Sequence, residues 1–235
     1  MNDENRIKQA LNDLLQEMRR LLGEMQPGSG QAGETRQDSE SRFQQLIEIS
    51  AAIAAVVEER DPYKKGHQFR VTDLACAIGM EMDLSRKQID GIRIGGLLHD
   101  IGKIFTPTEI LVKPTRLTEK EKQMMRTHVQ SGYEILKDIV FPWPITSMVL
   151  EHHERLDGSG YPEGLTADHL IMESRIMAVA DVVEAIASPR SYRPARGIDV
   201  ALYDIKGDRG IRYDPEAVDA CLRLFSEQGY KMLDD

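Results

Sequence analysis

The sequence predicts an all-α fold, and three observations support this prediction. Aromatic residues make up only 6% of the chain, whereas alanine, leucine, glutamate and methionine, which favour helices, are frequent. Apolar residues recur every three or four positions in several segments, as they do on one face of a helix. No segment alternates apolar and polar residues in the manner of a strand. With 235 residues, the chain has room for one domain and an extension.

Residues 1–26 are expected to form an amphipathic helix. Its apolar positions follow alternating steps of four and three residues and form one seam: Ile7, Leu11, Leu14, Met18, Leu21 and Met25. This spacing is typical of a short coiled coil, which would join two copies of the chain as a homodimer. An ordinary amphipathic helix packed on its own domain also fits the spacing, so both interpretations stay open.

Residues 27–41 are expected to form a flexible linker. Proline, glycine, serine, glutamine and glutamate dominate this stretch, and Gly28, Gly30 and Gly33 are closely spaced. Such a composition offers too little apolar surface to bury, so a packed structure is not expected there. The domain that carries the chemistry would then occupy residues 42–235.

The rest of the chain predicts a series of helices. Two of them should begin with a capping box, in which side chains satisfy the first free amides. These pairs are Ser85 with Gln88 and Thr118 with Glu121. A further helix is expected from Ile171 to Ile186, where Asp181 stands among apolar residues and requires a positive partner if it is buried. The glycines and proline between Gly158 and Gly164 predict a turn-rich loop.

Charge and cysteine usage exclude several classes of protein. The formal net charge of −9 argues against binding to DNA or to anionic membranes, because both need a cationic surface. No apolar run approaches the ~20 residues that span a bilayer. Cys76 and Cys221 stand alone and no secretory signal precedes them, so we expect a cytoplasmic protein. A phosphate-bearing substrate would have to be held by local cations or by metal.

The histidines predict a metal site. A single histidine is more often a structural residue than a ligand, but five of the six fall in four places with the character of metal ligands: His67, His99 with Asp100, His128, and His152 with His153. Only His169 stands apart. Imidazoles and carboxylates without a thiolate pattern suit iron, manganese or zinc. With Asp181 the set exceeds the needs of one ion, so we infer two ions that share Asp100 and promote phosphodiester hydrolysis.

Lys103 lies one helical turn after Asp100. Its ammonium could hold a phosphate oxygen of the substrate, or it could form a structural ion pair with Asp100. Both roles stay open on the sequence alone.

Two stretches together resemble the HD-GYP family of bacterial cyclic di-GMP phosphodiesterases, over about residues 45 to 235. The first is His99-Asp100-Ile101-Gly102-Lys103, followed by His128, and the second is His152-His153-Glu154-Arg155-Leu156-Asp157-Gly158-Ser159-Gly160-Tyr161-Pro162. The resemblance implies an HD-type helical bundle. It also implies one metal held by His67, His99, Asp100 and Asp181, and a second held by Asp100, His128, His152 and His153.

The resemblance further implies the cofactor and the substrate contacts. Two divalent transition metal ions are expected, with iron as the first choice and manganese as the second. Some family members carry a glutamate where this chain has Tyr63, so a third metal is not expected. Asp100 and Lys103 would be catalytic, and the residues in contact with substrate would be Lys103, Arg190, Arg193, Gly160, Tyr161 and Pro162.

The expected reaction is hydrolysis of cyclic di-GMP to linear pGpG, or on to GMP if a second bond is cut. The alternatives are hydrolysis of another cyclic dinucleotide, a general HD-type nucleotide phosphohydrolase, and a catalytically silent module that binds a cyclic dinucleotide or a signalling partner protein. The general phosphohydrolase would not account for His128, His152 or His153. A silent module would usually lack some of the ligands.

Overall fold

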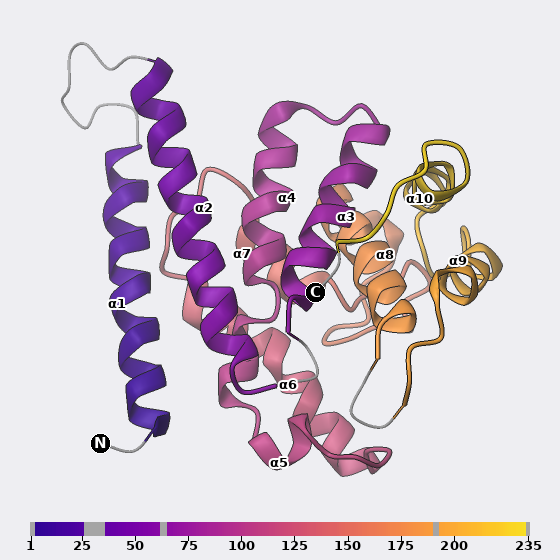
Figure 1. The fold of residues 1–235 in the computed structure, drawn as a ribbon, viewed down its shortest axis with the longest axis horizontal. Coiled ribbons are helices and arrows are strands. Elements are labelled where there is room, and N and C mark those ends of the chain that lie inside the picture. The colour runs from indigo at the N-terminus through magenta and orange to yellow at the C-terminus, as the bar shows by residue number, and fades with distance from the viewer. Residues whose placement is uncertain (1–2, 26–35, 62–64, 190–192, 234–235) are drawn as a thin grey trace.

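The all-α prediction is confirmed. A computed structural model describes residues 3–25, 36–61, 65–189 and 193–233, which contain α-helices and short 3-10 helices but no strand (Figure 1). The elements are α1 (Asp3–Glu24), α2 (Arg36–Glu58), α3 (His67–Glu81), α4 (Arg86–Leu98), η2 (Ile101–Phe105), α5 (Thr108–Leu111), α6 (Glu119–Leu136), α7 (Ile145–Glu151), η3 (Ala167–His169), α8 (Met172–Ala187), α9 (Ile198–Gly207) and α10 (Pro215–Ser226). None of these helices has the combination of length and apolar character needed to cross a membrane.

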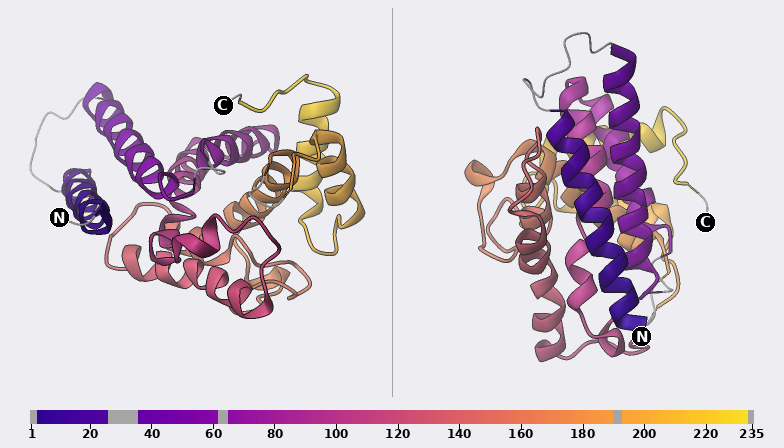
Figure 2. Two further views of the ribbon diagram at one scale, coloured as in Figure 1. Left: turned by 60° about the horizontal axis from the view of Figure 1, so that its bottom comes forward. Right: turned by 90° about the vertical axis from the view of Figure 1, so that its left-hand side faces the viewer.

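Helices α1 and α2 form an antiparallel pair along one side of the molecule (Figure 2). The buried positions of α1 are Leu11, Leu15, Met18, Leu21 and Leu22. All of them except Leu21 belong to the same core as the apolar residues of α2, so α2 of the same chain covers most of the predicted seam. The structure therefore favours the intramolecular interpretation. A homodimer through this helix stays a prediction, and it would require the covered seam to open.

The predicted linker ends earlier than expected. Helix α2 begins at Arg36, so residues 36–41 are helical, and the earlier part of the linker lies outside the described residues. Helix α2 therefore runs across the predicted boundary at residue 42, and the division into domains stays a prediction. Residues 36–41 are polar and exposed, but they contain neither glycine nor proline, and extending an existing helix costs little once the later turns are packed.

The remaining helices pack around α3, α4 and α8. Helix α3 lies against α4 and α8, while α7 contacts α4, α6 and α8. Two glycines of α4 allow these close approaches. A Cβ at Gly95 would lie 2.6 Å from the sulfur of Met148 in α7, and one at Gly96 would lie 2.5 Å from the hydroxyl of Thr72 in α3. These contacts bring the ends of several helices to one point, where the predicted ligands lie.

The predicted capping boxes, the helix of Asp181 and the turn-rich loop are also confirmed. Both predicted capping boxes form, at the start of α4 and at the start of α6. The run that carries Asp181 is helix α8. The stretch between α7 and α8 is a loop in which Gly158 and Gly164 have positive φ values of 75° and 68°, a conformation that favours glycine.

Candidate metal centre

All seven predicted metal ligands meet at one place inside the helical domain. They come from the ends or interiors of different elements: His67 begins α3, His99 and Asp100 join α4 to η2, His128 lies in α6, His152 and His153 follow α7, and Asp181 lies in α8. Six of them are buried, with exposed fractions from 0% to 8%, and His153 is partly buried. A cluster of this kind is costly to bury unless the groups have partners.

The seven side chains form two groups that share Asp100. His67, His99 and Asp100 place ligand atoms within 4.8 Å of one another, and so do Asp100, His128, His152 and His153. Each group has the donor set to hold a metal ion. Asp181 bridges the two groups, since its carboxylate oxygens lie 3.5 Å from Nε2 of His67 and 3.7 Å from Nδ1 of His153.

Three of the histidines are oriented by the backbone of their own helices. In each, Nδ1 hydrogen-bonds the carbonyl three residues earlier: His99 to Gly96 (2.6 Å), His128 to Met125 (2.7 Å) and His152 to Val149 (2.9 Å). The carbonyl can only accept, so Nδ1 carries the proton and Nε2 keeps its lone pair. The Nε2 atoms face the centre, where that of His128 lies 3.3 Å from Asp100 and 3.5 Å from Nε2 of His152.

His67 is oriented by a buried carboxylate that the sequence analysis missed. Nδ1 of His67 lies 2.5 Å from Oε2 of Glu184, which follows Asp181 by one turn of α8. The other oxygen of Glu184 accepts hydrogen bonds from Nε and Nη2 of Arg70, at 3.0 and 2.8 Å. A carboxylate that holds the far nitrogen of a histidine is the usual outer support of a metal ligand. The spacing of Asp181 and Glu184 on one helix face is the sequence signal that could have revealed it.

The residues of the centre fit a metal ion, because a buried ligand nitrogen lacks a donor and the side chains are of the right type. Nε2 of His99 is buried and has no hydrogen-bond partner among the residues that the structure describes, although it lies 3.5 Å from Oδ2 of Asp100. A buried nitrogen lone pair without a donor costs free energy, and a cation would satisfy it. Neutral imidazoles and carboxylates are ligands for divalent transition metals.

Lys103 is buried and pairs with Asp100. In this structure its ammonium therefore takes the ion-pair role, next to the groups that could hold metal. Arg60 donates hydrogen bonds to the backbone carbonyls of Lys103 and Ile104 and so ties the end of α2 to η2.

Of the two arginines predicted to contact substrate, the structure describes only Arg193. Arg193 donates hydrogen bonds to the carbonyls of Ala185, Ile186 and Ser188, so its guanidinium caps the end of α8. Arg190 lies outside the described residues, and so does Tyr63.

The loop after α7 places Tyr161 beside the centre. Its ring stacks on that of His153, with centroids 4.7 Å apart. Gly160 allows a close turn, since a Cβ there would lie 2.3 Å from Cα of Glu154, and Pro162 follows in an exposed position after a cis peptide bond. Buried Glu154 holds the loop by accepting hydrogen bonds from the amides of three successive residues, 163–165. The sequence motif that contains Glu154 does not by itself indicate this role.

A family model described as HD domain matches residues 51–217, which include all seven clustered side chains. The chain belongs to the HD domain family. It is 39% identical over 178 residues to the cyclic di-GMP phosphodiesterase response regulator RpfG of Xanthomonas campestris pv. campestris, covering 75% of this chain and 47% of the relative. It is 31% identical over 190 residues to the 3′3′-cGAMP-specific phosphodiesterase 1 of Vibrio cholerae, covering 80% of this chain and 44% of that protein.

Among solved structures, this HD domain protein is similar to an HDG"Y"P protein from Bdellovibrio bacteriovorus. The TM-score is 0.59 at 14% identity, over 96% of this chain and 81% of that chain, and this likeness supports the fold. Together these matches confirm the predicted HD-GYP resemblance and the HD-type helical bundle. The chain spans about half the length of the curated relatives it matches.

Burial keeps four histidines of the cluster neutral. It lowers the pKa of His99 to about 4 and the pKa values of His128 and His152 to about 3, and it also lowers the pKa of His153 well below its usual value. In each case desolvation of the imidazolium is the main cause. Near neutral pH the lone pairs are therefore available to metal.

These pKa values predict that the metal-free protein loses stability in mild acid. Unfolded histidines take up protons as the pH falls below about 6.5, whereas folded His99, His128 and His152 do not until about pH 4 or below, so the unfolded state binds more protons between these limits. We expect the free energy of unfolding to fall with pH in this window, by up to ~1.4 kcal/mol per pH unit for each such histidine. Urea unfolding from pH 7 to pH 5 measures it.

The control for this pH dependence is His169→Gln, at an exposed histidine outside the cluster. This variant should keep the slope of the wild-type protein. A stability that stays constant from pH 7 to pH 5 would contradict the buried, neutral state of the cluster.

Proposed function

We propose that this HD domain hydrolyses cyclic di-GMP to linear pGpG with the help of two divalent metal ions. The observation that supports this most is the pair of ligand groups that share Asp100. Relatives named as cyclic di-GMP and 3′3′-cGAMP phosphodiesterases support the substrate class. Iron is the metal we favour, followed by manganese, because the donors are imidazoles and carboxylates.

In this proposal His67, His99, Asp100 and Asp181 hold one ion, and Asp100, His128, His152 and His153 hold the other. When bound, such ions neutralise charge on phosphoryl oxygens and lower the pKa of a coordinated water. Hydrolysis adds the hydroxyl of water to phosphorus and its proton to the ribose 3′-oxygen, which leaves. Only one of the two phosphodiester bonds has to be cut to give pGpG.

The chain's own residues position the substrate. Lys103 contacts a phosphate oxygen of the scissile group, and its pairing with Asp100 keeps its ammonium at the centre in the absence of substrate. Tyr161 offers an aromatic face beside His153 on which a nucleobase can stack. Gly160 and Pro162 shape the loop that carries this ring. Arg190 and Arg193 remain proposed phosphate contacts, and Arg193 would have to leave the end of α8 to act.

The test is to measure metal content and turnover on one preparation. Protein purified without oxygen should contain two metal ions per chain by elemental analysis, and it should convert cyclic di-GMP to pGpG by chromatography. Removal of the metal with a chelator should abolish turnover, and iron(II) or manganese(II) should restore it. Metal-loaded protein that leaves cyclic di-GMP intact contradicts the proposal.

One alternative substrate is favoured by a specific observation. The relative named as specific for 3′3′-cGAMP makes a mixed cyclic dinucleotide the second candidate. Parallel assays with cyclic di-GMP and 3′3′-cGAMP decide between the two by the ratio of kcat/KM. Binding of either ligand without cleavage would instead indicate a silent signalling module.

A further inference from the structure

Arg126 lies at the edge of the metal centre and is not among the residues to which the proposed function assigns a role. It belongs to α6, two residues before His128, and its side chain is exposed. Its guanidinium carbon lies 4.8 Å from the centroid of the Tyr161 ring. That ring stacks in turn on His153, so the three side chains form a column from the centre to the surface.

Other cations of this region already have acceptors. Lys103 pairs with Asp100, Arg70 with Glu184, Arg60 with the carbonyls of Lys103 and Ile104, Arg155 with the carbonyls of His152 and Glu154, and Arg193 with carbonyls at the end of α8. By contrast, within the described part of the chain no carboxylate or carbonyl accepts a hydrogen bond from Arg126, which contacts the face of Tyr161. All its N–H donors therefore remain available to a ligand.

A cyclic dinucleotide offers such a cation a partner. It carries two phosphates, and in the proposed function the metal centre and Lys103 act on the one that is cleaved. The formal net charge of −9 gives the protein no general attraction for the other phosphate. An arginine is suited to this contact because its planar group can donate two parallel hydrogen bonds to phosphate. A cation–π contact at an exposed site is weak, so Arg126 can leave the ring at little cost.

We propose that Arg126 binds the second, uncleaved phosphate of the cyclic dinucleotide and so helps to select a substrate with two phosphates. This inference rests on the proposed function, since it concerns the same substrate. In the absence of substrate, the ring of Tyr161 holds the guanidinium at the edge of the centre. Arg126 thus acts on substrate affinity, whereas the cleaved bond lies at the metal centre.

The test compares two substrates in the metal-loaded protein. For cyclic di-GMP, Arg126→Ala should raise KM about ten- to a hundredfold, as expected for the loss of charge-assisted hydrogen bonds, and kcat should stay within about twofold. For bis(p-nitrophenyl) phosphate, which has a single phosphate, kcat/KM should stay within about twofold. Metal content should not change.

The matched control is Lys122→Ala. Lys122 lies one turn earlier on α6 and pairs with Glu119, so the variant removes the same unit of charge without touching Tyr161. It should keep the wild-type KM for cyclic di-GMP. Arg126→Lys should give an intermediate KM, because it retains the charge and loses the paired donors.

The outcomes separate this inference from the function on which it rests. If wild-type protein cleaves cyclic di-GMP and Arg126→Ala does so with an unchanged KM, the role of Arg126 is refuted and the function stands. An equal loss on both substrates, or an equal effect of Lys122→Ala, also refutes a specific phosphate contact. If wild-type protein cleaves bis(p-nitrophenyl) phosphate but no cyclic dinucleotide, the proposed function itself fails.

Discussion

Asp100→Asn is expected to abolish turnover of the cyclic dinucleotide, with a loss of at least about a thousandfold. Asp100 is the residue that both ligand groups contain, and its carboxylate lies 3.6 Å from His67, 3.5 Å from His99 and 3.3 Å from His128. Asparagine has nearly the same shape but carries no charge, so the second group loses its one carboxylate and the first keeps only Asp181. Elemental analysis should find fewer than one metal ion per chain, and the assay of cyclic di-GMP cleavage measures the loss of turnover.

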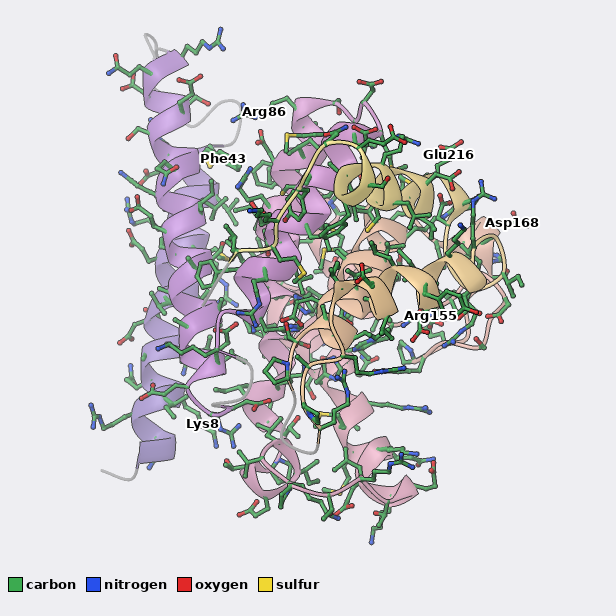
Figure 3. All side chains as sticks on the ribbon, turned by 45° about the vertical axis from the view of Figure 1, so that its right-hand side comes forward. Lys8, Phe43, Arg86, Arg155, Asp168 and Glu216 are labelled. Carbon is green, nitrogen blue, oxygen red and sulfur yellow. The ribbon has the colours of Figure 1, made fainter. Side chains whose placement is uncertain are left out.

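A second aspartate provides the control for this experiment. Asp168 lies in η3, is exposed, and belongs to neither ligand group (Figure 3). Asp168→Asn should therefore keep both metal content and turnover. Circular dichroism should show that Asp100→Asn retains its helices. If Asp100→Asn binds two metal ions and cleaves substrate at the wild-type rate, the shared role of Asp100 is wrong.

Glu184→Gln should weaken metal binding about ten- to a hundredfold, the usual effect of losing the outer support of a ligand. The variant leaves His67 without its carboxylate partner at 2.5 Å. It also removes the carboxylate charge that pairs with the buried guanidinium of Arg70, which should cost about 3–5 kcal/mol of unfolding free energy. Metal titration and urea unfolding of the metal-free protein measure these two effects separately.

The double variant Arg70→Met/Glu184→Gln distinguishes orientation of the ligand from general stability. Removing both charges together should restore much of the unfolding free energy, because no buried charge is then left without a partner. The metal affinity should stay low, since His67 still lacks the carboxylate. Arg70→Met alone should lower stability and retain most of the affinity. Recovery of full metal affinity in the double variant would contradict the orienting role.

The fold was predictable because its signals are local. The capping pairs at Ser85 and Thr118 fix where α4 and α6 begin, and the apolar spacing around Asp181 defines α8. The ligand set was predictable for a different reason. A single histidine or carboxylate does not identify a metal ligand, but the motif in which these residues occur does. The structure brings all seven together.

The remaining features depend on contacts between distant parts of the chain. Glu184 meets His67 and Arg70 across more than a hundred residues, and Arg126 meets Tyr161 from a different element. The spacing of Asp181 and Glu184 predicts that both carboxylates share one face of α8, but it does not show which residues Glu184 contacts. The start of α2 at Arg36 was missed for another reason. Composition identifies residues that need not be ordered, but it does not show how far a packed helix extends into them.

The two ways of fixing the histidine rings have different consequences for variation of the sequence. For His99, His128 and His152 the acceptor is a main-chain carbonyl of the preceding turn, so the side chains at Met125 and Val149 can change without altering which nitrogen carries hydrogen. At His67 the acceptor is a side chain, so the tautomer there depends on the identity of Glu184. Saturation mutagenesis should therefore find broad tolerance at 125 and almost none at 184.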